Sequence, residues 1–400
     1  MNESSRPLAG VRILDLTNVL SGPLACYQLG WLGAEVVKVE PVGIGDLARQ
    51  LGEAREQSKA NMGASFLAQN AGKKSVSLNL KHRRGTDIFR RLVRTADVLI
   101  ENFRPGVMER LGLGYEELKK ERPELIYCAI SGFGQQGPWR DRPAYDQIVQ
   151  GASGIMSVTG ESPDRPLRVG YPVADSIGGL TAAMAVAAAL NAPKRGCYID
   201  VSMMAAVLST MGWAVSNYMV AGVEPKPVGN ENVTSAPSGA FRCRDGLVNI
   251  SANKDEQWVI MARHLGLDHL LAHPDYLTRE DRKQNRDALR IEVEKKLAER
   301  DAADWAEELS ALGVPAGEVL SLPQLLSHPQ FAARGQAADF DGVLEDGRPL
   351  RVLRPGYLVD GRPLEASCPP PRLGADNDSV LAELGLTAQE MEELSRDGTI

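Results

Sequence analysis

Cysteine and histidine are scarce in this sequence, with five residues of each type among 400. The cysteines form no CxxC pair and no cluster of metal-ligand type, and their number is odd. Scattered thiols of this kind are typical of reduced proteins rather than of disulfide frameworks or zinc sites. We therefore expect no structural metal and a cytoplasmic location. The five cysteines are Cys26, Cys128, Cys197, Cys243 and Cys368.

Long apolar runs are also missing. The two most apolar stretches, 180–190 and 201–215, are too short or too interrupted by Ser and Thr to span a bilayer. The opening residues, MNESSRPLAG, are polar and lack the apolar core of a signal peptide. Basic residues are not in excess, because the formal net charge is −7 and the pI is near 5.5. We therefore expect a small-molecule substrate, with no nucleic acid and no membrane as partner.

Alternating strand and helix patterns fill the first 130 residues. A chain of 400 residues usually exceeds what one hydrophobic core can hold, so two domains are expected. Strand–helix–strand units of about thirty residues predict a parallel, doubly wound, Rossmann-like sheet of the α/β class. The predicted strands are 10–17, 34–40, 74–80, 97–103 and 125–131, and the predicted helices are 22–33, 84–96 and 115–122.

The second half of the chain changes in texture. Two helical stretches, at 177–191 and 201–220, precede a segment rich in Gly, Pro and Asn that reads as a long loop. A strand pair around Asp245-Gly246 follows, then charged helices across 255–312. The sequence also predicts a strand pair within 337–353 and two short helices within 379–398.

The motif GFGQQG at 132–137 matches the dinucleotide-binding fingerprint and follows a predicted strand. That fingerprint needs a helix to begin on its glycines, because the helix amides bind the pyrophosphate. Pro138 comes next and the following residues read as a loop. The sequence therefore favours a flexible glycine loop, which either is structural or covers a site.

Basic residues follow the ends or beginnings of predicted strands. Arg104 and Arg110 come after a strand, where ligands bind in parallel sheets, with Phe103 between them and that strand. Lys73 and Lys74 precede another strand. These side chains either bind phosphate or are solvated charges, and local sequence leaves both interpretations open.

Asp175 stands at the start of an apolar stretch, in the sequence VADSIGG. A short oxygen-bearing side chain at this position is typical of a helix cap. A carboxylate beside a helix N-terminus is also suited to nucleophilic catalysis, because it is ionised at neutral pH. Asp146, in RPAYDQ, likewise suits a helix N-terminus.

In their order along the chain, several stretches resemble family III CoA-transferases of the CaiB/BaiF type. That family includes formyl-CoA transferase and the carnitine CoA-transferases, and α-methylacyl-CoA racemase shares its fold. The resemblance covers nearly the whole chain, and its ordered set of motifs is more specific than any one of them. The stretches are RILDLTNVLSGPLACYQLGWLGAEVVKVEPVGIGD, NAGKKSVSLNLK, ADVLIENFRPGVMERLGLGYEEL, SGFGQQGPWRDRPAYDQIVQGASGIMSVTG, YPVADSIGG, GNENVTSAPSGAFRCRDG, LPQLLSHPQFAARG and PPRLGADNDSVLAELG.

The resemblance implies a CoA-transferase with coenzyme A as substrate and acyl carrier. It implies a large CoA-binding domain made of 1–220 and 330–400, a smaller α+β domain at 225–325, and an interlocked homodimer. It makes Asp175 the nucleophile, whose carboxylate forms a mixed anhydride and then a thioester with CoA. Glycine loops at 132–137 and 229–239 would close the site, and amides near Gly178 and Gly179 would stabilise the oxyanion. Positions matching the family's CoA contacts are Val19, Ser21, Lys73, Asn102, Phe103, Arg110, Leu111, Tyr145 and Met203.

Two departures from the family pattern narrow the activity. Oxalate-handling members carry glutamine where this chain has Leu20, which argues against a formyl-CoA:oxalate enzyme. Racemases carry a catalytic histidine where this chain has Tyr145, and tyrosine is a poor base near pH 7. Transfer of CoA to a free carboxylic acid, such as a small dicarboxylate, is therefore the leading hypothesis. The alternatives are an α-carbon isomerase of branched acyl-CoA and a CoA-binding protein without turnover.

Overall fold

A computed structural model describes residues 6–400, which form two compact units. The first unit takes in the chain up to Met156, Arg168–Val223 and Ala332–Ile400. The second is made of Ser157–Leu167 and Glu224–Phe331. The range 225–325, predicted for the small domain, lies within the second unit, which also includes a short segment from the middle of the chain.

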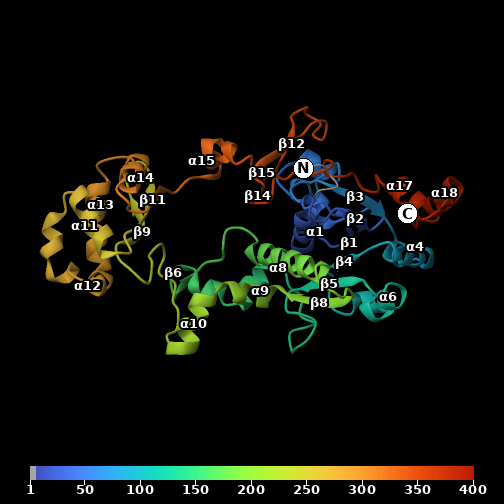
Figure 1. Cartoon of the computed structure of the whole chain (residues 1–400), viewed down its shortest axis with the longest axis horizontal. Helices are drawn as coiled ribbons and strands as arrows, with labels where there is room; N and C mark the ends of the chain where they lie inside the picture. Colours follow the sequence, from blue (N-terminus) through green and yellow to red (C-terminus); the bar gives the residue numbers. More distant parts are fainter. Residues whose placement is uncertain (1–5) are drawn as a thin grey trace. The chain divides into compact units, whose positions relative to one another are not determined.

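The first unit is built on a six-stranded parallel sheet (Figure 1). Its strand order is β3-β2-β1-β4-β5-β8, and every neighbouring pair is parallel. The α/β class and the doubly wound order predicted from the sequence are therefore confirmed for this sheet. The strands are β1 (Arg12–Leu16), β2 (Glu35–Glu40), β3 (Lys73–Ser77), β4 (Val98–Glu101), β5 (Ile126–Ser131) and β8 (Cys197–Ser202).

Strand β8 is absent from the sequence prediction, which began a helix at 201. It lies at the edge of the sheet, and its side chains alternate between partly covered and exposed positions, with Tyr198 and Asp200 exposed. An edge strand of this kind lacks the continuous apolar run that marks a buried parallel strand. The helix that follows begins at Met203 instead.

Helices cover both faces of this sheet. The longest is α8 (Val173–Leu190), which begins four residues before its predicted start. The remaining helices of the first unit are α1 (Ser21–Trp31), η2 (Leu47–Gln50), α2 (Arg55–Lys59), α3 (Ala64–Leu67), α4 (Arg83–Arg94), α5 (Val107–Arg110), α6 (Tyr115–Glu121), α7 (Asp146–Ala152), α9 (Met203–Thr210), α10 (Gly212–Ala221), α16 (Pro329–Ala333, which spans the boundary between the units), α17 (Asn377–Glu383) and α18 (Ala388–Arg396). Short antiparallel pairs are β12 (Ala337–Phe340) with β13 (Leu350–Leu353) and β14 (Leu358–Val359) with β15 (Arg362–Pro363).

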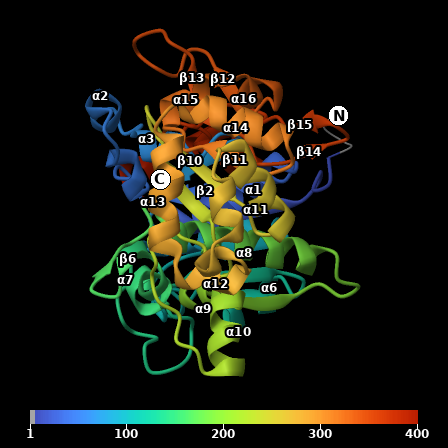
Figure 2. The same ribbon diagram turned by 90° about the vertical axis from the view of Figure 1, so that its left-hand side faces the viewer.

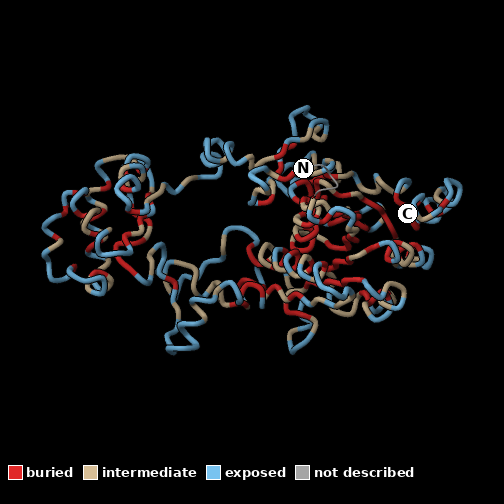
Figure 3. The backbone as a smooth tube through the Cα atoms, viewed as in Figure 1, coloured by how far each residue is buried: buried red, intermediate tan, exposed pale blue. Residues whose placement is uncertain are grey.

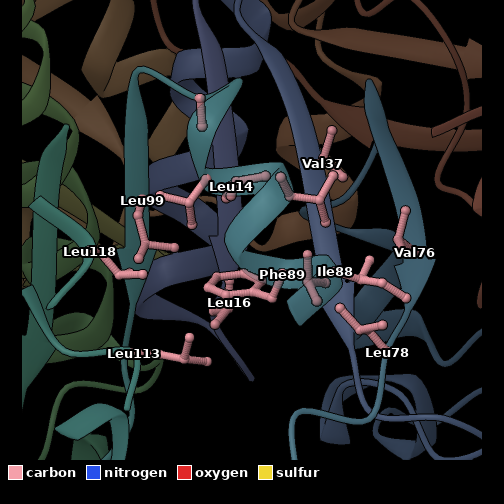
Figure 4. Packing of buried hydrophobic residues seen from close by; sticks show 14 of the residues in the cluster. Leu14, Leu16, Val37, Val76, Leu78, Ile88, Phe89, Leu99, Leu113 and Leu118 are labelled. Atoms are coloured by element: carbon pink, nitrogen blue, oxygen red, sulfur yellow. The ribbon is translucent and has the colours of Figure 1, made fainter. Parts of the chain in front are cut away.

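Alternating residues of each strand supply the two cores of the first unit. Leu14, Val37, Val76 and Leu99 project to one face and pack around Phe89 of α4 (Figure 4). The intervening residues, such as Ile13, Val36 and Ile100, project to the opposite face, where α1 and α8 pack. The buried trace therefore follows the strands, whereas loops and outer helix faces are exposed (Figure 3). Each fully buried leucine or valine contributes about 1.5–3 kcal/mol.

Helix α8 lies directly against α1, and its two glycines permit the close approach. A Cβ atom on Gly179 would lie 2.4 Å from the carbonyl oxygen of Ser21, and one on Gly178 would lie 2.8 Å from Cγ of Met203. By length and mean hydropathy α8 also meets the criteria for a membrane span. That is weak evidence, because a core helix meets the same criteria, and Ala182, Val186 and Leu190 of α8 are buried in the fold.

The second unit has its own core. Its antiparallel sheet has the order β11 (Ala316–Glu318), β10 (Leu247–Ser251) and β9 (Ser238–Arg242). Val248 and Ile250 of β10 pack with Trp258, Leu297 and Trp305 of the surrounding helices (Figure 2). The other elements are η3 (Ile155–Val158, which spans the boundary), β6 (Gly160–Ser162), β7 (Arg165–Pro166), α11 (Asp255–His264), η4 (Asp268–Ala272), η5 (Pro274–Tyr276), α12 (Arg279–Gln284), α13 (Arg286–Leu297), α14 (Ala302–Ala311) and α15 (Leu322–Ser327).

Candidate active site

A pocket of about 350 Å³ opens beyond the carboxyl ends of β1, β4 and β5. The strand order reverses at β1, which has β2 on one side and β4 on the other. Ligands of doubly wound folds bind at this reversal point, because the loops of neighbouring strands turn in opposite directions there. The lining residues are Asn18, Val19, Ser21, Leu47, Asn102, Phe103, Arg104, Pro105, Ile130, Ser131, Gly132, Arg140, Arg142, Pro143, Ala144, Tyr145, Asp175 and Met203.

Asp175 lies in the first turn of α8, and its side chain lines this pocket. In the part of the chain that the structure describes, its carboxylate accepts no hydrogen bond and forms no ion pair. Burial raises the pKa of Asp175 to about 7, and the nearby negative charge of Asp146 raises it further in the same direction. A carboxylate that is unpaired, partly desolvated and directed into a pocket is available to attack an electrophile.

Asp146 is the residue that caps α8. Its Oδ1 accepts the backbone N–H groups of Ala174, at 2.8 Å, and Asp175, at 3.2 Å. Its Oδ2 accepts a hydrogen bond from Gln150 at 2.6 Å. The interpretation of Asp175 as the cap is therefore wrong, since that residue lies inside the helix and another carboxylate satisfies its first free amides.

The predicted oxyanion donors must also be corrected. Because α8 begins at Val173, the amides of Gly178 and Gly179 lie in the second turn and donate to carbonyls of the preceding turn. The first-turn amides are used as well, by Tyr171, Asp146 and Pro172. The two glycines serve the close packing of α8 on Ser21 and Met203 instead.

Seven of the ten predicted site residues meet in this pocket. Val19 and Ser21 lie in and just after the loop that follows β1, while Asn102 and Phe103 follow β4. Tyr145 precedes α7 and is 69% exposed. These four segments are separated by up to about 130 residues in sequence and by only one pocket in space. The seven are Asp175, Val19, Ser21, Asn102, Phe103, Tyr145 and Met203.

Asn102 joins two walls of the pocket. Its Oδ1 accepts the backbone N–H of Asn18, and its Nδ2 donates to the carbonyl of Asn18, both at 2.8 Å. Next to it, the buried carboxylate of Glu101 accepts the backbone N–H of Phe103 at 2.8 Å. Burial raises the pKa of Glu101 to about 8. The loops after β1 and β4 are therefore fixed by side chains rather than left mobile.

Three predicted contacts lie outside the pocket lining. Lys73 is 1% exposed, and its ammonium group lies 2.9 Å from Asp15 Oδ2 and donates to the carbonyl of Pro23. Its charge is thus used inside the fold, which corrects its assignment as a ligand contact. Leu111 packs against the core on the α4 side. Arg110 is exposed, and its Nη1 lies near Gly106, beside Arg140 of the pocket lining.

Arginines of the pocket mouth are the feature that sequence reasoning largely missed. Arg104, Arg140 and Arg142 all line the pocket, and none of them forms an ion pair with a described carboxylate. Arg142 lies over the ring of Trp139, at 4.9 Å from its centroid. Three unpaired guanidinium groups make this mouth a site for an anionic ligand. The available signal was the segment PWRDRP, a basic loop between two prolines.

The glycine loop at 132–137 carries no dinucleotide site. No helix begins on its glycines, and the next helix starts only at Asp146. The loop is held by Ser131 Oγ, which accepts the N–H of Gly134, and by Asp200, which accepts the N–H of Gln135. Gly132 itself lines the pocket, so the loop borders the site.

His269 and His273 are spaced four residues apart, a spacing that can place two ligands on one helix face. Over residues 6–400 no group of three or more His, Cys, Asp or Glu side chains gathers as a metal site would require. The pair lies in a 3₁₀ segment and the residue after it.

The sequence profile of CoA-transferase family III matches residues 8–377. The chain is 40% identical over 351 residues to an acetyl-CoA:oxalate CoA-transferase of Acetobacter aceti, covering 86% of this chain and 89% of that one. It is 35% identical over 389 residues to a succinyl-CoA:glutarate CoA-transferase of Mus musculus, covering 96% and 87%. The crystal structure of a CaiB/BaiF family protein from Brucella suis superposes with a TM-score of 0.84 at 33% identity, covering 94% and 99%.

Proposed function

The chain belongs to CoA-transferase family III and is a CoA-transferase, and we propose that it moves CoA from an acyl-CoA donor to a free carboxylic acid through covalent intermediates on Asp175. The observation that carries this proposal is the carboxylate of Asp175, which is unpaired and lines a pocket whose mouth holds three free arginines. A nucleophile and an anion-binding mouth are what an acyl-CoA requires, since its thioester carries a phosphate-rich handle.

The proposed steps conserve the energy of the thioester. A carboxylate oxygen of Asp175 attacks the thioester carbonyl, the carbon–sulfur bond breaks, and CoA leaves as thiolate. The thiolate then attacks the aspartyl carbonyl of the mixed anhydride, which releases the donor acid and leaves an aspartyl-CoA thioester. The acceptor carboxylate attacks that thioester and forms a second anhydride. The returning thiolate attacks the acceptor carbonyl, which yields the new acyl-CoA and restores the Asp175 carboxylate.

The acceptor that we propose is a dicarboxylic acid. The relatives described above act, by their names, on oxalate and on succinate and glutarate, all of which carry two carboxylates. A dicarboxylate offers one group for the acyl transfer and a second anionic group for recognition. The arginines of the mouth provide the complementary charge.

We also propose that the active form is a cytoplasmic homodimer. Large apolar side chains of α8, α9 and α10 are exposed on the first unit, which is unusual for a monomer. Trp213 is 88% exposed and Val220 is 85% exposed. Light scattering on the purified protein should give twice the chain mass of 43.2 kDa. The other exposed residues of this set are Leu180, Met184, Leu208, Tyr218 and Met219.

Trapping of the aspartyl adduct tests the proposal. The protein would be incubated with succinyl-CoA or acetyl-CoA, treated with hydroxylamine and analysed by intact-mass and peptide mass spectrometry. We expect a hydroxamate on the peptide that contains Asp175, and the donor that forms it fastest identifies the acyl preference. Exchange of solvent deuterium into a branched acyl-CoA without any acceptor acid would instead support the isomerase.

Replacing Arg140 with alanine should raise KM for the CoA thioester about tenfold while kcat changes by less than about twofold. The reason is that a phosphate contact is equally strong in the ground state and in the transition state. The matched control is Arg94→Ala, because that arginine is exposed on α4 and pairs with Glu121. A fall in kcat with constant KM would contradict a role for Arg140 in substrate binding.

The acid limb of kcat/KM should follow the ionisation of Asp175. Since the pKa of this carboxyl is raised to about 7, the reactive carboxylate fraction falls about tenfold for each pH unit below 7. Asp146→Asn removes the second cause of that shift and should move the limb to lower pH. Glu101→Gln serves as the control, because the pKa of Glu101 is raised to about 8 but its carboxyl holds a backbone amide. A limb that moves with the Glu101 variant alone would contradict the assignment.

A further inference from the structure

A buried layer of charge lies beneath the loop that follows β1, and the proposed chemistry does not use it. Six charged side chains, three acidic and three basic, are each no more than 2% exposed. Burying a charge is costly unless it is paired, so such a layer requires a reason. Its members are Asp15, Lys38, Glu40, Asp46, Arg49 and Lys73.

Most of these charges pair only with one another. Lys73 contacts Asp15 at 2.9 Å, and Arg49 contacts Glu40 through two hydrogen bonds of 2.7 and 2.8 Å. Replacing such pairs by apolar residues is often neutral for stability, so pairing alone does not account for the layer. The exception is Asp46, which also bonds to backbone groups at the pocket.

Asp46 binds two walls of the pocket with one carboxylate. Its Oδ2 lies 3.0 Å from the ammonium group of Lys38. Its Oδ1 accepts the N–H of Val19 and the N–H of Ala48, each at 2.9 Å. Val19 lines the pocket, and so does Leu47, the neighbour of Ala48 in η2.

Val19 is held in a conformation that it does not favour. Its φ is +68°, in the left-handed region, and it is the only β-branched residue among the described non-glycine residues with positive φ. This conformation costs an L-residue about 1–2 kcal/mol. The preceding residues are fixed as well, because Lys38 donates to the carbonyl of Thr17 and Asn102 bonds both backbone groups of Asn18.

We propose that Asp46 is a positioning residue that holds Val19 left-handed and thereby shapes the wall of the pocket for CoA. This inference rests on the proposed function, because it assumes that CoA binds along that wall. Without the Asp46 acceptor, the N–H of Val19 loses its partner, and the loop relaxes to negative φ. A glycine at position 19 adopts either sign of φ without strain, so it makes the loop much less dependent on Asp46.

A double-mutant cycle tests this coupling. Asp46→Ala would be introduced into the wild-type chain and into Val19→Gly, and the Kd of CoA would be measured by calorimetry for all four proteins. We expect Asp46→Ala to weaken CoA binding tenfold or more when Val19 is present, and less than threefold when glycine is present. A general structural role for Asp46 would weaken binding by the same factor in both backgrounds, and that result would overturn the proposal.

A matched control comes from the same charge layer. Glu40→Gln removes a buried negative charge that contacts Arg49 and the N–H of Asp46 but not Val19. Its effect on the Kd of CoA should be equal in both backgrounds. Asp46→Asn, measured in the same two backgrounds and judged by the same criterion, replaces the alanine variant if that protein fails to fold. Absence of CoA binding by the wild-type protein would reject the proposed function itself, and equal factors with intact binding would reject only the role of Asp46.

Discussion

Asp175→Asn is expected to lower kcat for CoA transfer by at least about a thousandfold, with little change in the Kd of CoA. The amide has nearly the shape of the carboxylate, but it is not a nucleophile, so no mixed anhydride can form. The pocket lining and the arginines of its mouth remain in place, which preserves binding. Steady-state kinetics with the best donor, together with calorimetric titration of CoA, would measure both quantities.

Thermal unfolding of the same variant provides an independent check on its fold. In an unfolded chain the pKa of aspartic acid lies near 3.8, whereas burial raises that of Asp175 to about 7. The ionised form is therefore disfavoured in the fold, and stability declines as pH rises from about 4 to about 7. Asparagine has no such cost. Asp175→Asn should therefore have a higher Tm than the wild type at pH 8, and the difference should vanish near pH 4.

The control for this experiment is Asp141→Asn, which removes an exposed carboxylate from the loop that contains Arg140 and Arg142. Its kcat should equal that of the wild type. Transfer at the wild-type rate by Asp175→Asn would refute covalent catalysis by this residue and leave the fold and the family membership unaffected. A higher Tm combined with loss of kcat would match a nucleophile whose environment favours reactivity over stability.

The sequence predicts those parts of the fold that depend on local pattern. The five strands β1 to β5 and their intervening helices follow from buried apolar runs and from the spacing of βαβ units. Strand β8 could not be found in this way, because its edge position leaves Tyr198 and Asp200 exposed. Its partner is β5, some 65 residues away, so no nearby signal marks it.

The candidate site shows the same division. The resemblance to the family places seven residues that the structure brings together, although the sequence alone gives no reason for their proximity. Lys73 was misjudged because a lysine at a strand start usually reaches solvent or a ligand, whereas here Asp15 pairs with it inside the fold. Asp46 was missed because its partner Val19 is 27 residues away, and a left-handed valine has no sequence signature.

Gly179→Ala is expected to destabilise the first unit by about 2 kcal/mol. In an ordinary helix, alanine in place of glycine stabilises by about 1 kcal/mol. Here the added Cβ would lie 2.4 Å from the carbonyl oxygen of Ser21 and 3.2 Å from Cβ of Leu24. A backbone oxygen cannot rotate away as a side chain can, so α8 and α1 must separate.

Two other glycines complete a graded series measured by urea unfolding. Gly151→Ala, in α7, meets only Met156 Sδ at 4.0 Å and should stabilise the protein by about 0.5–1 kcal/mol. Gly178→Ala meets Cγ of Met203 at 2.8 Å, and because this side chain is flexible its cost should lie between the other two. Equal effects of Gly179→Ala and Gly151→Ala would contradict the close packing of α8 on α1.

The same substitution should reduce activity by more than the stability change alone explains. Helix α8 carries Asp175, and α1 begins at Ser21 directly after the loop that holds Val19, so both sides of the pocket are attached to this helix pair. A separation of several tenths of an ångström would move the nucleophile away from the thioester, and geometric errors of this kind lower rates strongly. We therefore expect kcat/KM of Gly179→Ala to fall at least tenfold at a temperature where the variant remains fully folded, whereas Gly151→Ala should retain the wild-type value. Normal activity in a destabilised Gly179→Ala protein would mean that the distance between the two helices does not control the chemistry.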